Sequence, residues 1–209
     1  MRISYPVTGN KVEIVFFGKE MGEVKVEWLS IDFLNSDWRD WRGSGRRENR
    51  LEKAEWLEQF LQQWGLSAPL PIDRKISTEL LNLRECMRRI TESFVRSETV
   101  VPEDLAALNQ ALSLALAHPR LVVDGEGSYH MEQVSPISGW DQVISQIARS
   151  FAELLVHEEA RRIKICDNHD CQWVFFDESR NRVRRWCDDK MCGNLMKVRR
   201  FRERQKEKG

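Results

Sequence analysis

The spacing of apolar residues predicts a mainly helical chain over most of its length. In four segments, apolar residues recur at three- and four-residue steps, which places them on one face of an α-helix. Gly65 ends the first segment, and Pro102 opens the third at a position where helices accept proline. Because each predicted helix has one apolar face, the helices are expected to pack on one another. They span about residues 56–64, 76–94, 102–116 and 140–159.

Shorter stretches with β-branched and aromatic residues predict small β-hairpins between and before the helices. One hairpin is expected over residues 12–18 and 24–29, followed by a short helix at 31–35. A second is expected within residues 120–134, where Asp-Gly-Glu-Gly supplies the turn. Gly43-Ser44-Gly45, between basic residues, indicates an exposed loop.

Charge divides the chain into two parts although the net charge is zero. Residues 161–209 carry 15 Lys and Arg against 8 Asp and Glu, formally +7, whereas residues 1–160 carry 18 against 25, formally −7. A basic tail on an acidic body indicates contact with a polyanion or an acidic surface; a solvated charged helix explains the charge alone equally well. We therefore expect a helical N-terminal domain at 1–160 and a separate C-terminal module at 161–209.

Several functional classes find no support in the sequence. The chain has no apolar run near the ~18 residues of a membrane span and no secretory leader, so we expect a cytoplasmic protein without a membrane partner. It has no P-loop, GxGxxG, GxSxG or HExxH motif, and no histidine stands in a catalytic spacing. We expect no enzymatic activity.

Four cysteines follow the pattern of a structural zinc site. Two Cys-x4-Cys pairs, separated by 15 residues, can bring four thiolates to one tetrahedral ion. Two disulfides, a catalytic metal, or His169 in place of a cysteine are the alternatives, and a reducing compartment disfavours disulfides. The fifth cysteine, Cys86, lies beside a helical apolar stripe and is expected in the core. The predicted ligands of one Zn²⁺ are Cys166, Cys171, Cys187 and Cys192.

The segment around these cysteines predicts a treble-clef-like finger, in which a β-hairpin leads to a helix. Residues 172–176 and 182–187 have strand composition on either side of a turn-like segment. Gly193 is expected to allow close backbone approach beside the metal, and Asn194 to cap the following helix.

This segment resembles the CGNR zinc-finger family. The resemblance lies in Cys-x4-Cys, Phe175-Phe176-Asp177-x-Ser179-Arg180-Asn181, Arg184-Arg185-Trp186-Cys187 and Cys192-Gly193-Asn194, with Leu195 where the family motif has arginine. The N-terminal part is similar to the ABATE domain that precedes this finger, through Ile31-Asp32-Phe33-Leu34-Asn35, Trp38-Arg39 and Trp64-Gly65-Leu66. The resemblance implies a bacterial, stress-linked transcription regulator whose finger binds DNA.

The basic residues of the finger are the candidate nucleic-acid contacts. One face of the last helix carries cations at three- and four-residue steps and can meet phosphates, while Arg184, Arg185 and Arg200 are the candidates for base contact. Val198 and Phe201 are expected to pack on the hairpin. Trp173 and Trp186 are expected in the core of the finger rather than stacked on bases. The candidate contacts are Arg180, Arg182, Arg184, Arg185, Lys197, Arg200 and Arg204.

A cluster of polar and aromatic residues in the N-terminal domain is a candidate effector pocket. It comprises Trp28, Asp32, Asn35 and Trp38. Helix capping with a tryptophan-rich core, or a dimer surface, is the alternative explanation of the same residues.

The sequence thus predicts a regulator that binds double-stranded DNA through a zinc finger. The helical domain is expected to sense a small-molecule effector or to form a homodimer, which shifts how the fingers meet DNA. A zinc-stabilised protein–protein interaction module, an RNA binder and an enzyme with a pocket in the helical domain are the alternative functions.

Overall fold

The computed structural model of the 209-residue chain describes residues 2–4, 11–18, 20–21, 25–115, 118–125, 127–134, 138–157 and 160–207. Its helices are α1 Leu29–Leu34, α2 Ala54–Gln63, α3 Arg74–Arg96, α4 Pro102–Ser113, α5 Trp140–His157 and α6 Asn194–Lys206, with 3₁₀ turns η1 Arg50–Glu52 and η2 Ala160–Arg162 and a π-helical turn η3 Asp189–Gly193. Its strands are β1 Arg2–Ser4, β2 Lys11–Gly18, β3 Glu20–Met21, β4 Lys25–Trp28, β5 Asp37–Arg39, β6 Arg47–Asn49, β7 His118–Val123, β8 Tyr129–Val134, β9 Ile163–Ile165 and β10 Val174–Phe176.

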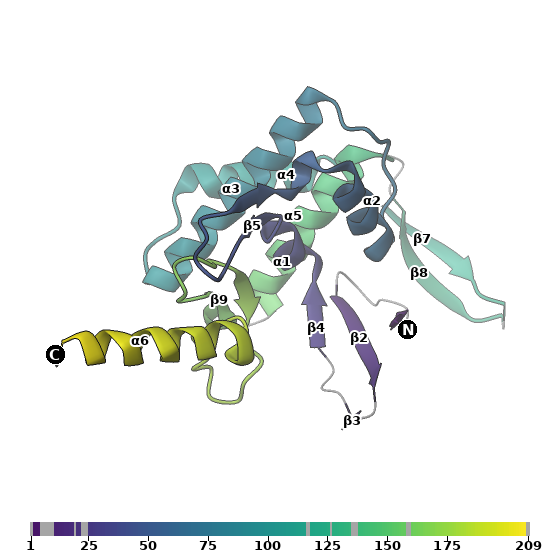
Figure 1. The fold of residues 1–209 in the computed structure, drawn as a ribbon. Helices are drawn as coiled ribbons and strands as arrows, with labels where there is room; N and C mark the ends of the chain where they lie inside the picture. Colours follow the sequence, from purple (N-terminus) through teal and green to yellow (C-terminus); the bar gives the residue numbers. More distant parts are fainter. Residues whose placement is uncertain are drawn as a thin grey trace.

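The body of the molecule is the helical packing that the apolar stripes predict. Helices α3, α4 and α5 pack together around the short α1, and α2 lies beside them (Figure 1). Their stripes supply most of the core; Met87, Ile147 and Phe151 are fully buried. The prediction of a mainly α fold with small hairpins is therefore confirmed. Among the described residues, no helix has both the length and the apolar content to cross a membrane.

The antiparallel hairpins extend this body at its edges. Strand β2 pairs with β4, which leads directly into α1, and β7 pairs with β8 to form an arm that projects from the helices (Figure 1). The segment around Gly43-Ser44-Gly45, predicted only as an exposed loop, connects the further pair β5 and β6.

The hairpin of the C-terminal module differs from the predicted one. Strand β10, after the first two cysteines, pairs with β9, which comes before them. Residues 182–187 form no strand; instead, their backbone carbonyls accept hydrogen bonds from other parts of the module. Asp167 donates its amide to the Arg185 carbonyl at 2.9 Å, and the Lys164 ammonium binds the carbonyls of Arg182 and Arg184. The alternating composition of residues 182–187 predicted a strand wrongly, because backbone turns and side-chain donors satisfy these carbonyls instead of a neighbouring strand.

The C-terminal module shares its core with the helical domain. Ile163 and Val174 are 2% and 1% exposed and belong to the same apolar cluster as the helices. The rings of Trp28 and Phe176 lie 5.9 Å apart across the boundary. Burial of these side chains therefore couples the position of β9 and β10 to that of α1 and α3.

A buried asparagine makes the most specific contact across this boundary. Asn35, directly after α1, donates its side-chain Nδ2 to the Val174 carbonyl and accepts the Val174 amide on Oδ1, both at 2.9 Å. The amide group thus pairs with β10 as a neighbouring strand would. Asn35 is only 4% exposed, so water cannot replace these bonds without opening the boundary.

We predict that Asn35→Ala lowers the free energy of unfolding by about 2–4 kcal/mol, because the buried N–H and C=O groups of Val174 both lose their partners. Chemical denaturation followed by far-UV circular dichroism measures this loss. Asn82→Ala, on the exposed face of α3, is the matched control and is expected to change stability by less than about 0.5 kcal/mol. An equal effect of the two substitutions would contradict the proposed importance of the Asn35 contact.

Candidate metal centre and basic helix

The four cysteines that the sequence singles out converge on one point. Their Sγ atoms all lie within 4.8 Å of one another, and Cys187 Sγ lies 3.7 Å from that of Cys171 and 3.9 Å from that of Cys192. Zn²⁺ bonded to four thiolates at about 2.3 Å places the sulfurs about 3.8 Å apart, so the arrangement fits this ion. No pair among these cysteines is a disulfide. Burial of all but the partly exposed Cys187 fits a closed, structural site.

Hydrogen bonds within the cluster prepare it for a cation. Bonds from the Cys171 and Cys187 thiols lower the pKa of Cys166, which favours the thiolate form of this sulfur. The same bonds raise the pKa of Cys171 and Cys187. A divalent cation must therefore displace their protons, which makes metal uptake weaker as the pH falls.

Two tight turns aim the sulfurs. The first turn, between Cys166 and Cys171, is called the first knuckle here. In it, the carbonyl of Asn168 accepts the Cys171 amide at 2.8 Å. The fully buried Asn168 side chain donates Nδ2 to the Trp41 carbonyl at 2.8 Å and to Cys192 Sγ at 3.4 Å. In the second, Asp188 caps η3 by accepting the Met191 amide at 2.7 Å. Asn168 was not selected from the sequence, although its position between the ligands Cys166 and Cys171 could have indicated a role in shaping the metal site.

The Cys-Gly-Asn motif has a steric basis in this structure. A Cβ on Gly193 would lie 3.1 Å from Cδ1 of Trp186 and 3.3 Å from Oδ1 of Asp189, so glycine permits the close approach expected at this position. Asn194 does not cap α6 as predicted: it is the first residue of the helix and donates Nδ2 back to the Lys190 carbonyl at 3.1 Å. The cap interaction instead falls one turn earlier, on η3.

A buried carboxylate organises the turn between β10 and the third cysteine. Asp177, fully buried, accepts hydrogen bonds from Lys164 Nζ at 2.7 Å, from the Ser179 amide and hydroxyl, and from the Arg184 amide at 3.0 Å. Burial alone would raise the pKa of Asp177, but these hydrogen bonds outweigh it and hold the pKa below its ordinary value. This accounts physically for the Asp-x-Ser part of the motif.

Residues 42–47 are exposed, as predicted for the loop around Gly43, but the Arg42 carbonyl also contacts the finger. Arg199 on α6 donates Nη2 to the Arg42 carbonyl at 2.9 Å and Nη1 to Asp170 at 2.6 Å. Gly43 has a φ of +92°, and a Cβ there would lie 2.6 Å from the Arg199 guanidinium. Trp41 packs against the cysteine cluster. Arg199 was not selected from the sequence, because it differs from the other cations of the last helix only in lying off the basic face.

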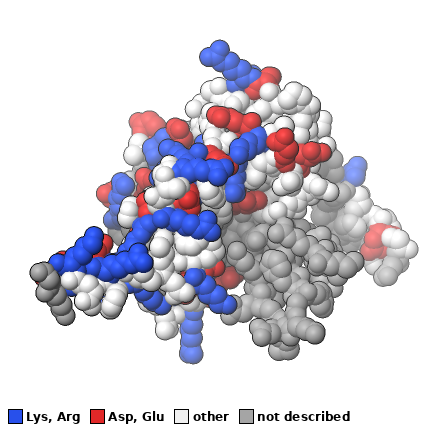
Figure 2. All heavy atoms as spheres, in the orientation of Figure 1, with Lys and Arg blue, Asp and Glu red and all other residues white. Residues whose placement is uncertain are grey.

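The predicted nucleic-acid residues fall into two groups in the structure. Lys197, Arg200 and Arg204 are exposed on α6, which projects from the body (Figure 1), and Lys and Arg side chains cover much of this helix (Figure 2). Leu195, where the family motif has arginine, is partly buried, so Lys197 is the first exposed cation of the helix. Arg180 and Arg182 are exposed on the turn before the third cysteine.

The two remaining arginines contribute to the framework of the finger. Arg184 donates Nη2 to the Cys187 carbonyl at 2.8 Å and lies over the Phe175 ring. Arg185 is ion-paired with Asp167 at 2.6 Å and lies over Trp186. Arg200 on α6 also lies over Trp186, at 5.7 Å from the ring centroid, but it makes no ion pair with a described carboxylate.

The aromatic and apolar residues of the finger are distributed differently from the expectation. Trp186 is 8% exposed and Trp173 is partly buried beside the cysteine cluster, as expected for core residues. Val198 and Phe201, however, are 46% and 55% exposed. The Phe176 ring instead lies beside Trp28 of the helical domain.

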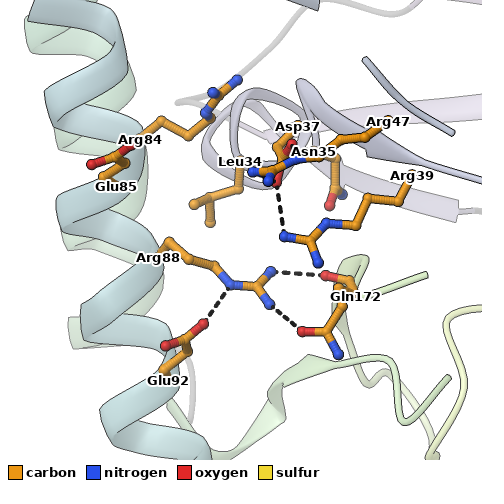
Figure 3. A pocket seen from close by; sticks show the side chains of 10 residues that line it. All are labelled: Leu34, Asn35, Asp37, Arg39, Arg47, Arg84, Glu85, Arg88, Glu92 and Gln172. Carbon is orange, nitrogen blue, oxygen red and sulfur yellow. Dashed lines mark hydrogen bonds and ion pairs between the residues drawn. The ribbon is translucent and has the colours of Figure 1, made fainter. Parts of the chain in front are cut away.

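The four residues of the predicted effector pocket make separate contacts in the structure. Asp32 accepts the Trp64 indole N–H at 2.8 Å, Trp28 packs on Phe176, and Trp38 lies beneath the Arg46 and Arg50 guanidinium groups. Asn35 lines a polar cavity together with four arginines that sequence analysis did not select as site residues (Figure 3).

Together, the helical body, the four-sulfur centre and the basic helix define a zinc-finger protein with a helical N-terminal domain. Residues 27–158 match the ABATE family, described as "Putative stress-induced transcription regulator", and residues 162–205 match the CGNR zinc finger. The first match covers more than half of the chain, so the protein belongs to the ABATE family, and both resemblances seen in the sequence are confirmed. A comparison with curated proteins gives no match.

We predict that Cys187→Ser abolishes the binding of one zinc ion per chain and unfolds the last ~45 residues, because structural zinc supplies much of the folding energy of a small module. Metal analysis and hydrogen exchange of α6 and β10 measure both effects. Cys86→Ala is the control, since Cys86 lies outside the cluster and donates its thiol to the Asp104 carbonyl. Retention of one zinc by the Cys187 variant would overturn the four-cysteine assignment.

We also predict that Asp177→Asn destabilises the finger by about 2–4 kcal/mol at neutral pH, because the Lys164 ammonium loses its carboxylate. Since the folded-state pKa of Asp177 is lowered, its stabilisation is complete above the ordinary value of 3.8 and is lost as the pH falls through the lowered value. Urea unfolding of the zinc-loaded protein at pH 7 measures the difference. Stability equal to wild type would contradict this role.

Proposed function

We propose that this protein is a transcription regulator that binds double-stranded DNA through its zinc finger. Membership of a family described as transcription regulators supports the regulatory role. The proposed contacts are the exposed cations of α6, with one Zn²⁺ held by the four cysteines as a structural ion. The finger holds no open coordination position for catalysis in this proposal, because all four ligands are thiolates.

The observation that carries the proposal is that α6 is held at its start and exposes its cations. No residue of this helix is buried, yet its first turns are fixed by η3 and by Arg199. Within the described residues, Lys197, Arg200 and Arg204 make no ion pair. A helix that is held at its first turns and carries cations without carboxylate partners along one face can approach a polyanion at low ordering cost.

The dimensions of this face suit a DNA groove. Seven residues separate Lys197 from Arg204, which corresponds to about 10 Å along the helix, close to the ~12 Å width of the major groove. Three cations over this length can contact about three phosphates. Arg180, on the neighbouring turn, is positioned by the same zinc centre and adds a further candidate contact.

The helical domain is proposed to control how the finger is presented. One finger with about three phosphate contacts gives modest affinity, so we propose that the regulator acts as a homodimer. A signal bound to the helical domain would shift the population of finger arrangements, and the contacts through Asn35 and Arg199 give such a shift a physical route.

A specific observation favours a second candidate function, a protein–protein interaction module. Val198 and Phe201 expose apolar surface on the same helix. An acidic partner with an apolar pocket would use both features. Buried Trp186 gives less support to an RNA-binding function, because it leaves little aromatic surface for base stacking.

We predict that the zinc-loaded protein binds random duplex DNA with a log–log salt slope of about 3 per finger, or about 5 for a dimer that uses both fingers, since each neutralised phosphate contributes about 0.9. Fluorescence polarisation across a salt series measures the slope. A chelator should abolish binding. Absence of binding at low salt would favour the protein-partner function instead.

Arg200→Glu should weaken this binding at least about tenfold and lower the salt slope by about 1, without changing the zinc content. Lys75→Glu is the charge-matched control, because this side chain is exposed on α3 in the helical domain. If both variants bind DNA alike, the face of α6 is not the interface.

A further inference from the structure

A small polar cavity lies where α3 and β5 meet the first knuckle of the finger (Figure 3). It has a volume of about 150 Å³ and is lined by four arginines, Arg39, Arg47, Arg84 and Arg88. Such a volume accommodates several water molecules, and therefore an ion of phosphate size. The wall nearest the finger is Gln172, the residue after the cysteine Cys171.

Part of the arginine charge is balanced within the protein. Asp37 accepts two hydrogen bonds from Arg47, at 2.6 and 2.9 Å, and one from Arg39 at 3.3 Å. Arg88 pairs with Glu92 at 2.9 Å. These carboxylates position the guanidinium groups, as second partners commonly do around a bound anion.

Among the described residues, Arg84 has no hydrogen-bonded carboxylate to balance its charge. It is 8% exposed and donates Nη1 to the Ser36 hydroxyl at 2.9 Å and to the Asn49 side-chain oxygen at 2.8 Å, which are both neutral acceptors. In the part of the chain that the structure describes, it forms no ion pair with a carboxylate. Asp37 and Glu85 act on Arg84 only at longer range, and burial still lowers the pKa of its guanidinium. An anion in the cavity would therefore relieve part of a penalty that the fold otherwise carries.

Arg39 supplies a second unsatisfied group. Its Nε is buried and has no hydrogen-bond partner among the described residues. Its guanidinium points across the cavity toward that of Arg88, which comes from the opposite wall (Figure 3). Two facing guanidinium groups repel each other unless an anion lies between them, and their planar forks match the oxygens of a phosphate or carboxylate.

We propose that this cavity binds a small doubly charged oxyanion, a phosphate-like ion or a short dicarboxylate. Its direct ligands are Arg39 and Arg88, and Arg84, whose guanidinium points away from that pair in Figure 3, adds positive charge to the cavity wall. Arg88 also donates to the Gln172 carbonyl at 2.8 Å and to its side-chain oxygen at 3.0 Å. The anion therefore lies against the link that ties α3 to the first knuckle, and its binding stabilises the finger on the helical domain. This site does not depend on DNA binding by α6.

Calorimetric titration of the zinc-loaded full chain with inorganic phosphate, sulfate and succinate, each against sodium chloride of matched ionic strength, tests the proposal. We expect saturable binding at one site per chain and a rise in Tm. Tighter binding of phosphate and sulfate identifies a tetrahedral ion, and tighter binding of succinate identifies a dicarboxylate. No binding beyond the chloride control for any of the three anions overturns the proposal.

Variants locate the site. Arg39→Gln, chosen because Arg39 is only partly buried, should weaken anion binding at least about tenfold, whereas Arg149→Gln on α5 should leave it unchanged. Arg200→Glu, which is expected to weaken DNA binding, should retain the anion, so the two functions are separable. Wild-type anion affinity in the Arg39 variant, or loss of the anion in the Arg200 variant, overturns the assignment.

Discussion

The convergence of four sulfur atoms on a single point is the constraint on which the finger depends. The ligands lie up to 26 residues apart in the chain, and no compact apolar core of their own could bring them together: the cluster around them holds only a few aromatic side chains. Two turns therefore have to be shaped by polar contacts, from Asn168 in the first and Asp188 in the second. The direction in which α6 leaves the molecule follows from the second turn, because the helix continues directly from η3.

The finger is also fixed to the helical domain by contacts that have no equivalent in a freely tethered module. Asn35 pairs with the backbone of β10, Arg88 holds Gln172, and Arg199 returns from α6 to the Arg42 carbonyl. A change in the helical domain can consequently reach the basic helix through rigid, directional bonds rather than through a linker, which favours a mechanism based on a small reorientation.

Sequence reasoning succeeded where one local pattern determines the structure. Helical stripes such as that of α3 specify both the element and its buried face, and the cysteine spacing indicates a shared ion. It was less successful where a residue acts through a distant partner. The strand predicted at residues 182–187 is absent because β10 pairs with β9 instead, and the bonds between Asn35 and Val174, 139 residues away, were not predicted. The arginines of the cavity come from α3, β5 and β6, and no spacing rule connects them.

The place of β9 ahead of the first cysteine limits how this finger can be exchanged between proteins. A cassette cut at Cys166 would carry β10 without its partner strand, and a cassette cut at residue 161 would still lack the asparagine that pairs with Val174. A recipient protein would have to offer an amide side chain and an apolar surface in matching positions. Recombination among proteins of this architecture should therefore keep the finger and the helical domain together.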